Sequence, residues 1–217
     1  MYITVVVKFF TYNKDIKDDH LTKATHPKEI KGVEQIMFNH WLRNHKVASW
    51  LLTIVRIYLG YSWIKGGIEK LTGGFDAGGF LQGAIAKSTG DHPAVQGWWA
   101  AFLEHAALPG VKFFNVLIPL GETLVGLGLI LGTFTTFAAL MGMVMNAAFL
   151  FSGTVSTNAQ MLLLEMFIVV AAANAGRIGL DRWVLPYLRG LFHRHHDGMD
   201  PTPAPAPGMN GKSKGAA

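Results

Sequence analysis

Four long apolar runs dominate the hydrophobic pattern of the chain, at residues 47–64, 111–131, 134–151 and 161–173. Each run contains at most two charged residues. A helix needs roughly 20 apolar residues to cross a hydrocarbon core about 30 Å thick, and the runs approach that length with their polar flanks. The pattern therefore predicts an all-α fold, an integral membrane bundle of four helices that each cross a lipid bilayer.

Two further segments have weaker amphipathic patterns. In the long connection between the first two runs, the apolar spacing favours short helices in the outer membrane interface. The residues that set this spacing are Phe75, Phe80, Leu81, Ile85, Trp98, Trp99, Phe102 and Leu103. After the fourth run, apolar and basic residues alternate over 178–188, which is typical of a helix on the inner membrane surface.

The two ends of the chain are polar and flank a central domain at 37–190. Residues 1–36 are Lys-rich, with one short β-like stretch at 3–7, and have two interpretations. They are either a native, loosely ordered cytoplasmic extension or a segment upstream of a native start at Met37. Residues 191–217 form a basic tail rich in Pro and Gly, a composition typical of disorder.

The net charge of +5 comes from basic residues that flank the apolar runs rather than lining one amphipathic face. A membrane location explains this basicity, so we expect the lipid bilayer as a partner and no nucleic acid. Arg43 and Lys46 precede the first run, and Arg177 and Arg182 follow the last. The positive-inside rule then predicts a multi-pass protein of the cell membrane with both termini in the cytoplasm.

Several kinds of cofactor site find no support in the sequence. The chain has no cysteine, which excludes thiolate metal sites, cysteine-ligated clusters and a persulfide carried on the chain. No histidine lies within an apolar run, and no dinucleotide fingerprint follows a strand pattern. We therefore expect no haem, flavin or metal, and His193, His195 and His196 are interpreted as a solvated cluster.

Each apolar run carries one polar side chain near its middle: Arg56, Glu122, Asn146 and Glu165. A charged group at the bilayer centre costs on the order of 3 kcal/mol, so such residues usually face a bundle interior. Trp63 shares the helical face of Arg56 because the two residues are seven positions apart. Tryptophan is also common at membrane interfaces, which is an alternative place for Trp63.

These polar residues have three interpretations. Either they bind a quinone head group, or they pass protons or ions, or they only hold the helices together through an Arg56–acid pair bridged by Asn146. For the first, Glu122 and Glu165 are the candidate catalytic acids, and Arg56, Glu122, Asn146 and Trp63 are the candidate quinone-binding residues. We expect Glu122 to pair with Arg56, because the first two runs are sequence neighbours, and Glu165 to be the surplus acid.

Three spaced motifs resemble those of the DoxX family of small bacterial membrane proteins. They are Arg56-x-x-Leu59-Gly60, Gly66-Gly67-x-x-Lys70-Leu71 and Gly121-Glu122-x-x-x-Gly126-x-x-Leu129-x-x-Gly132. The closing run at 174–188 is similar to the end of a Gram-positive-type subgroup. The resemblance covers roughly residues 37–190 and implies a four-helix membrane bundle.

Members near the DoxD branch are described as the membrane subunit of thiosulfate:quinone oxidoreductase, which oxidises thiosulfate to tetrathionate and reduces quinone. The resemblance therefore implies a membrane oxidoreductase subunit that passes electrons from thiosulfate or a related small reductant to quinone. Because no DoxA-like domain is evident, a soluble or membrane redox partner subunit is expected. The alternatives are a non-enzymatic membrane anchor or assembly partner of a redox enzyme, and a small-solute carrier.

Overall fold

The computed structural model describes residues 27–197, with side chains over 36–188, and this part of the chain is helical without strands. The expected all-α fold is confirmed for these residues. The β-like stretch at 3–7 and the Pro-rich tail lie outside them. The chain divides into two compact units after Arg182.

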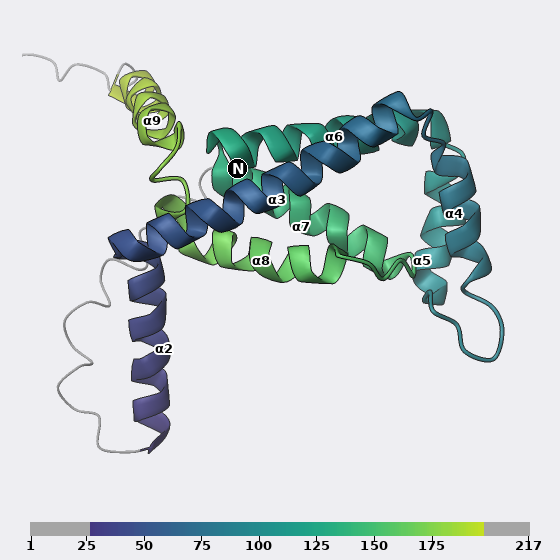
Figure 1. Cartoon of the computed structure of the whole chain (residues 1–217), viewed down its shortest axis with the longest axis horizontal. Helices are drawn as coiled ribbons and strands as arrows, with labels where there is room; N and C mark the ends of the chain where they lie inside the picture. Colours follow the sequence, from purple (N-terminus) through teal and green to yellow (C-terminus); the bar gives the residue numbers. More distant parts are fainter. Residues whose placement is uncertain (1–26, 198–217) are drawn as a thin grey trace, which may run out of the picture. The chain divides into compact units, whose positions relative to one another are not determined.

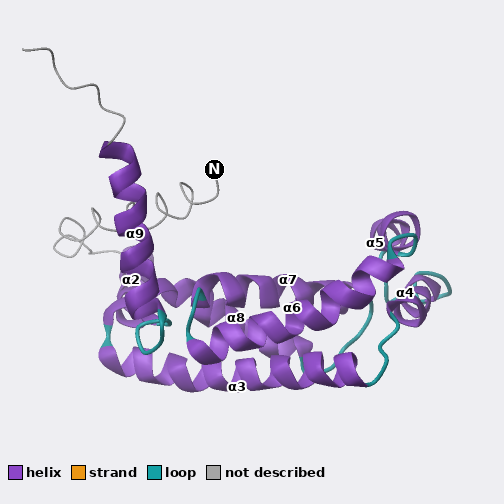
Figure 2. Cartoon of the chain, turned by 90° about the horizontal axis from the view of Figure 1, so that it is seen from above, coloured by secondary structure: helices purple, strands orange, loops and turns teal. Residues whose placement is uncertain are grey.

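Four helices correspond to the four apolar runs. They lie lengthwise beside one another, and each packs against two of the others (Figures 1 and 2). Their bounds are α3 (Lys46–Thr72), α6 (Val111–Leu131), α7 (Thr135–Phe151) and α8 (Asn158–Ala171), the last continued by a 3-10 helix at Ala172–Asn174. Helix α3 contacts α6 and α8, and α7 contacts the same two helices.

Glycines allow α3 and α6 to pack so closely that their backbones are in contact. A Cβ atom at Gly60 would lie 2.8 Å from the carbonyl oxygen of Gly126, and one at Gly126 would lie 2.7 Å from that of Gly60. At Gly67 a Cβ atom would lie 2.9 Å from the carbonyl oxygen of Pro119. Small residues are used in this way where membrane helices pack closely. The packing at Gly67 also accounts for the continuation of α3 beyond its expected end at Ile64.

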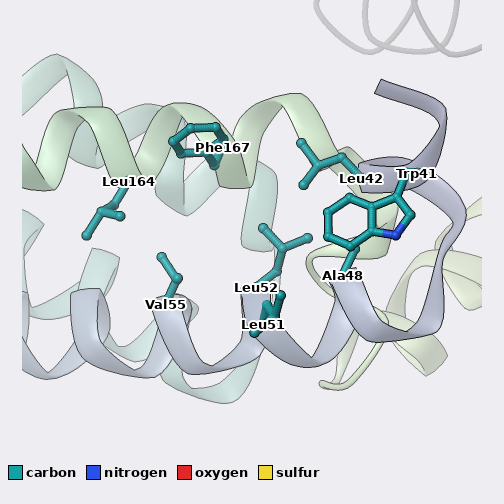
Figure 3. A pocket seen from close by; sticks show the side chains of 8 residues that line it. All are labelled: Trp41, Leu42, Ala48, Leu51, Leu52, Val55, Leu164 and Phe167. Atoms are coloured by element: carbon teal, nitrogen blue, oxygen red, sulfur yellow. The ribbon is translucent and has the colours of Figure 1, made fainter. Parts of the chain in front are cut away.

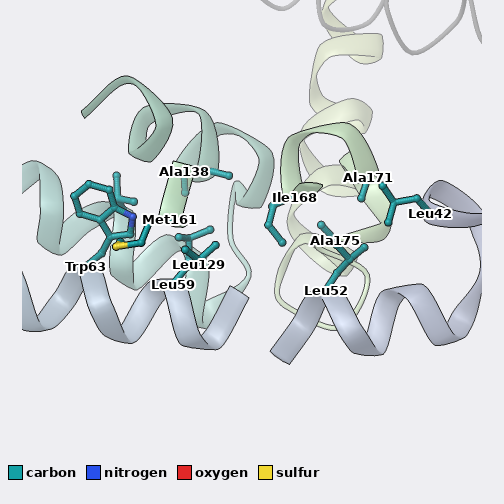
Figure 4. Packing of buried hydrophobic residues seen from close by; sticks show 12 residues of the cluster. Leu42, Leu52, Leu59, Trp63, Leu129, Ala138, Met161, Ile168, Ala171 and Ala175 are labelled. Carbon is teal, nitrogen blue, oxygen red and sulfur yellow. The ribbon is translucent and has the colours of Figure 1, made fainter. Parts of the chain in front are cut away.

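The four helices enclose an apolar core and also expose large apolar side chains. Leu59, Leu129 and Ile168 are completely buried within the core (Figure 4). By contrast, Ile54 and Phe137 on the outer surface are 64% and 61% exposed. Soluble proteins rarely expose apolar surface on this scale. Within the described residues, α3 and α6 are long and apolar enough to cross a membrane, whereas α7 and α8 are shorter apolar helices.

A small helical layer lies at the end of α3 that is remote from Lys46 (Figure 1). It consists of α4 (Ala77–Ala86), α5 (Gly97–Phe102) and a π-helix at Leu103–Ala107. Leu81 and Leu103 are buried in its own apolar cluster. Trp99 joins the layer to the end of α7, because its Nε1 donates a hydrogen bond of 3.0 Å to Ser152 Oγ. The amphipathic helices expected here are present, and their place in the outer interface stays a prediction.

Two more helices lie outside the four. Helix α2 (Pro27–Asn44) runs across the expected boundary at residue 36 and contacts α3 and α8. Helix α9 (Asp181–Asp197) covers most of the surface helix expected at 178–188 and extends beyond it. The side chains of His193, His195 and His196 on α9 lie outside the described ones, so the interpretation of that cluster stays a prediction.

Candidate functional site

Arg56 binds backbone carbonyl groups rather than an acid. Its Nη1 donates to the carbonyl oxygen of Ala175 at 3.0 Å, and its Nη2 donates to that of Ile178 at 2.6 Å. The guanidinium is buried, at 2% exposure of the residue. The expected pairing of Arg56 with Glu122 or Glu165 is therefore wrong, because the segment that follows α8 returns to α3 and supplies the acceptors.

The returning segment also binds the first turn of α7. The carboxylate of Asp181 accepts hydrogen bonds from the backbone N–H groups of Phe134 and Thr135, at 2.6 and 2.9 Å. These N–H groups have no partner within their own helix, so Asp181 caps α7 from a distant part of the sequence. Gly132 has a φ of 65°, and a Cβ atom there would lie 2.8 Å from the Cα atom of Gly179.

Asn174 fixes the junction between α2 and α3 in the same way. Its Nδ2 donates to the carbonyl oxygens of Leu42 and His45, at 2.9 and 3.1 Å. We call Arg56, Asn174 and Asp181 the backbone-binding cluster, since all three side chains contact main-chain groups. The closing run of the sequence is thus a scaffold that holds one end of the four helices together.

Glu122 pairs instead with Lys70. The distance from Lys70 Nζ to Glu122 Oε2 is 2.8 Å, and the side chains are 28% and 3% exposed. A Cβ atom at Gly66 would lie 3.3 Å from the same carboxylate oxygen, so the glycine leaves room for the acid. Lys70 was not expected as the partner of Glu122, although Lys70 follows Gly66-Gly67 in the motif and lies on the helical face of Trp63.

The central cluster consists of Trp63, Asn146 and Glu165, which come from three helices. The carboxyl group of Glu165 accepts hydrogen bonds from Trp63 Nε1 at 2.6 Å and Asn146 Nδ2 at 2.9 Å. Glu165 and Asn146 are completely buried and Trp63 is 4% exposed, so the interfacial alternative for Trp63 is wrong. Gly142 is required here because a Cβ atom at this position would collide with the Glu165 carboxyl group.

The central cluster and the Lys70–Glu122 pair lie at different positions along α3, because Lys70 follows Trp63 by roughly 10 Å at a rise of about 1.5 Å per residue. A Cβ atom at Gly121 would lie 3.5 Å from the Met145 side chain, and these residues directly precede Glu122 and Asn146 in the chain. Arg56 is roughly 10 Å along α3 from Trp63, given a rise of about 1.5 Å per residue. The structure therefore brings Trp63, Asn146 and Glu165 together. Glu122 lies beside Gly66, about one turn of α3 from Trp63, and Arg56 lies about two turns away in the other direction.

The central cluster has an unusual charge balance. Its two hydrogen-bond donors are neutral, and within the described side chains no cation is within ion-pair distance of Glu165. Asn146 Oδ1 is buried and has no hydrogen-bond partner there either. A carboxyl group in an apolar interior that no cation holds ionised is suited to take up and release a proton. Among the described residues, no group of three acidic or histidine side chains could hold a metal ion.

Residues 51–154 match the family model of DoxX. This match assigns residues 51–154 to the DoxX family. The matched residues form the DoxX membrane domain and include Lys70, Glu122 and Asn146, whereas Glu165 and the closing run follow them. No curated protein and no solved structure gives a significant match to the chain.

Proposed function

We propose that α3, α6, α7 and α8 of this DoxX family protein each cross the cell membrane, with both ends of the chain in the cytoplasm. The outward apolar side chains support this arrangement, because lipid would cover them. A single cysteine at exposed Thr89 should react with an impermeant thiol reagent added outside intact cells. A cysteine at exposed Asn44 should react only after the cells are opened, and the reverse pattern would contradict the orientation.

We further propose that the protein is the membrane subunit of an oxidoreductase that passes electrons from thiosulfate or a related small reductant to quinone. The observation that carries this proposal is the buried carboxyl group of Glu165, held by neutral donors beside an acceptor without a partner. A quinone head group needs a proton donor as it is reduced, and its hydroquinone needs acceptors for its hydroxyl groups. Glu165 and Asn146 Oδ1 offer both.

In this proposal the central cluster serves the reduction of quinone. Two thiosulfate ions would each lose one electron and join through a new S–S bond, while quinone takes up two electrons and two protons. Glu165 would donate a proton to a quinone oxygen, with Trp63 and Asn146 positioning its carboxyl group. Glu122 would be the second acid, reached from solvent beside the partly exposed Lys70. Arg56 has no place in this site.

Since the chain has no cysteine, a redox partner subunit would carry the sulfur chemistry. A direct test of the quinone half measures binding of a short-chain quinone to the purified protein in detergent. Glu165→Gln keeps the shape of the side chain but removes its acidic proton. We expect this variant to remain folded and to lose about tenfold or more in quinone affinity.

The matched control is Glu69→Gln, which removes an exposed acid that lies 3.9 Å from Lys65. This variant should bind quinone as the unchanged protein does. If Glu165→Gln also keeps its affinity for quinone, the central cluster is not the quinone site. Thiosulfate-dependent bleaching of quinone absorbance, measured with the partner subunit, would then test the reaction itself.

A second candidate is a non-enzymatic anchor or assembly partner of a redox enzyme. The backbone-binding cluster favours it, because three buried polar side chains there serve the fold alone. In that case Glu165 would be a further structural contact. Equal quinone affinity and turnover in Glu122→Gln and Glu165→Gln, with both variants folded, would support this function over the first.

A further inference from the structure

The buried charged side chains lie on two sides of the central cluster. In the described helices α3, α6, α7 and α8, the charged residues that are not exposed are Arg56, Lys70, Glu122 and Glu165. Trp63, which binds Glu165, comes seven residues after Arg56 and seven before Lys70 on α3. A proton that reaches Glu165 along the helices therefore comes either from the Lys70 end or from the Arg56 end.

Polar groups continue from the central cluster toward Lys70. Gly66 follows Trp63 by roughly 4.5 Å along α3, at a rise of about 1.5 Å per residue. A Cβ atom at Gly66 would lie 3.3 Å from Glu122 Oε2, and this oxygen lies 2.8 Å from the ammonium group of Lys70. The Lys70 side chain is 28% exposed, so solvent reaches the pair. Because about one helical turn separates the two acids along α3, a proton can pass between them through water.

Apolar side chains fill the opposite direction. Leu59 and Leu129 lie beside Trp63, and Ile168 follows Glu165 by three residues on α8 (Figure 4). These three apolar side chains are completely buried. Toward α2, the groove between α2, α3 and α8 is lined by aliphatic and aromatic side chains (Figure 3). Water does not settle in apolar cavities, so this direction offers no carrier for a proton.

The charged groups at the Arg56 end are engaged by the main chain. Arg56 donates to two carbonyl oxygens, and Asp181 accepts from two backbone N–H groups. On α2, Arg43 donates to the carbonyl oxygen of Val170 at 2.9 Å. A guanidinium group does not release its proton in proteins, so neither arginine can relay one. The two ends of the four helices therefore differ in their access to Glu165.

We propose that Glu165 exchanges its proton with the Lys70 end alone, by way of Glu122. After Glu165 gives its proton to a quinone oxygen, Glu122 passes a proton to the Glu165 carboxylate and takes up another from solvent beside Lys70. In the proposed membrane placement this end is the outer one, so both protons of quinone reduction come from outside the cell. The proposal rests on that placement and on the proposed acid role of Glu165.

The test follows the protonation of Glu165 in sealed liposomes that hold one full-length protein each. Single cysteines, Thr89→Cys or Asn44→Cys, are biotinylated from outside and captured, which selects liposomes with the Lys70 end or the Arg56 end outward. Both positions are exposed. Trp63 Nε1 lies 2.6 Å from Glu165 Oε1, so tryptophan fluorescence reports the state of the carboxyl group. The part of the pH response that Glu165→Gln abolishes belongs to Glu165.

A rapid pH change outside the liposomes should produce this response in the Thr89→Cys population and not in the Asn44→Cys population. The pH inside is held constant by a strong buffer. A response of equal rate in both populations would overturn the proposal. So would a response in the Asn44→Cys population alone, or the absence of a Glu165-dependent response in either.

Glu122→Gln keeps the shape of the relay acid but removes its proton, and it should slow the response by about tenfold or more. The matched control is Glu69→Gln, an exposed acid at the same end of α3, which should respond at the unchanged rate. An unchanged rate in Glu122→Gln would contradict the relay. The assay contains no quinone. A response from the Lys70 end in a protein that binds no quinone would therefore sink the proposed function and leave the proton route in place.

Discussion

Arg56 and Glu165 are both buried ionisable residues in apolar helices, yet Arg56 is bound by main-chain groups and Glu165 by side chains. The guanidinium of Arg56 donates to two backbone carbonyl oxygens, and Asp181 and Asn174 of the same cluster also bind main-chain groups. The carboxyl group of Glu165 is held by two side chains, from Trp63 and Asn146. Backbone partners belong to the fold, whereas a site held by side chains can change its protonation or admit a ligand without unfolding the main chain.

This contrast explains how one chain carries both a fixed end and a candidate reaction site. Helix ends leave main-chain groups without partners inside the helix, and where these groups are buried, polar side chains can satisfy them. The backbone-binding cluster does this for α2, α7 and the segment after α8. The central cluster lies within the helices, where the main chain is already satisfied, so its polar groups are available for another role.

The largest effect should come from the backbone-binding cluster. Arg56→Met removes the buried cation and leaves the carbonyl groups of Ala175 and Ile178 without donors, which should cost about 3–5 kcal/mol of unfolding free energy. Thermal unfolding in detergent would show this loss. The control Ile57→Met changes an exposed neighbour on α3 and should leave the midpoint almost unchanged. If Arg56→Met were as stable as the unchanged protein, the backbone-binding cluster would not have this structural role.

The Lys70–Glu122 pair should give the next largest effect. Lys70→Met leaves the Glu122 carboxylate buried without its cation, and we expect a loss of about 2–3 kcal/mol. Adding Glu122→Gln should recover part of that loss, because the unpaired charge is then gone. A double-mutant cycle of thermal stability measures this coupling. Strictly additive losses would show that the contact contributes nothing.

Loss of the α7 cap should have a smaller effect. Asp181→Ala removes both acceptors for the N–H groups of Phe134 and Thr135 and should cost about 1–2 kcal/mol. Asp181→Asn keeps one acceptor oxygen, so its stability should lie between that of Asp181→Ala and that of the unchanged protein. Hydrogen exchange at the first turn of α7 would report the same order, and identical protection in all three proteins would count against the cap.

The smallest effect should be an increase in stability. Ala172, after the end of α8, has a φ of 53° and a ψ of −124°, a region that favours glycine. Ala172→Gly should raise stability by about 1 kcal/mol, because relief of strain exceeds the added chain entropy. Ala173→Gly is the control and should lower stability slightly. A lower melting temperature in Ala172→Gly would contradict the strained conformation.

Part of the candidate site was open to prediction because it depends on local pattern. Helical spacing placed Trp63 on an inward face, and the cost of burying polar groups singled out Glu122, Asn146 and Glu165. The hydrogen-bond and ion-pair partners of these polar side chains could not be predicted in the same way. Lys70 is the partner of Glu122, and its position in the motif beside Gly66 and Gly67 was the available signal.

The sequence by itself determined where the four apolar helices lie along the chain and which polar residues face inward, but it did not predict the helix that begins at Pro27. Hydrophobic periodicity and the free-energy cost of buried charge act within one helix, so they can be read without a fold. Only the tertiary structure decided that Arg56 binds the carbonyl groups of Ala175 and Ile178. The partners of Arg56 depend on where the segment after α8 contacts α3 and on the relative register of the helices. Both follow from packing between residues far apart in the chain, such as the backbone contact of Gly60 with Gly126.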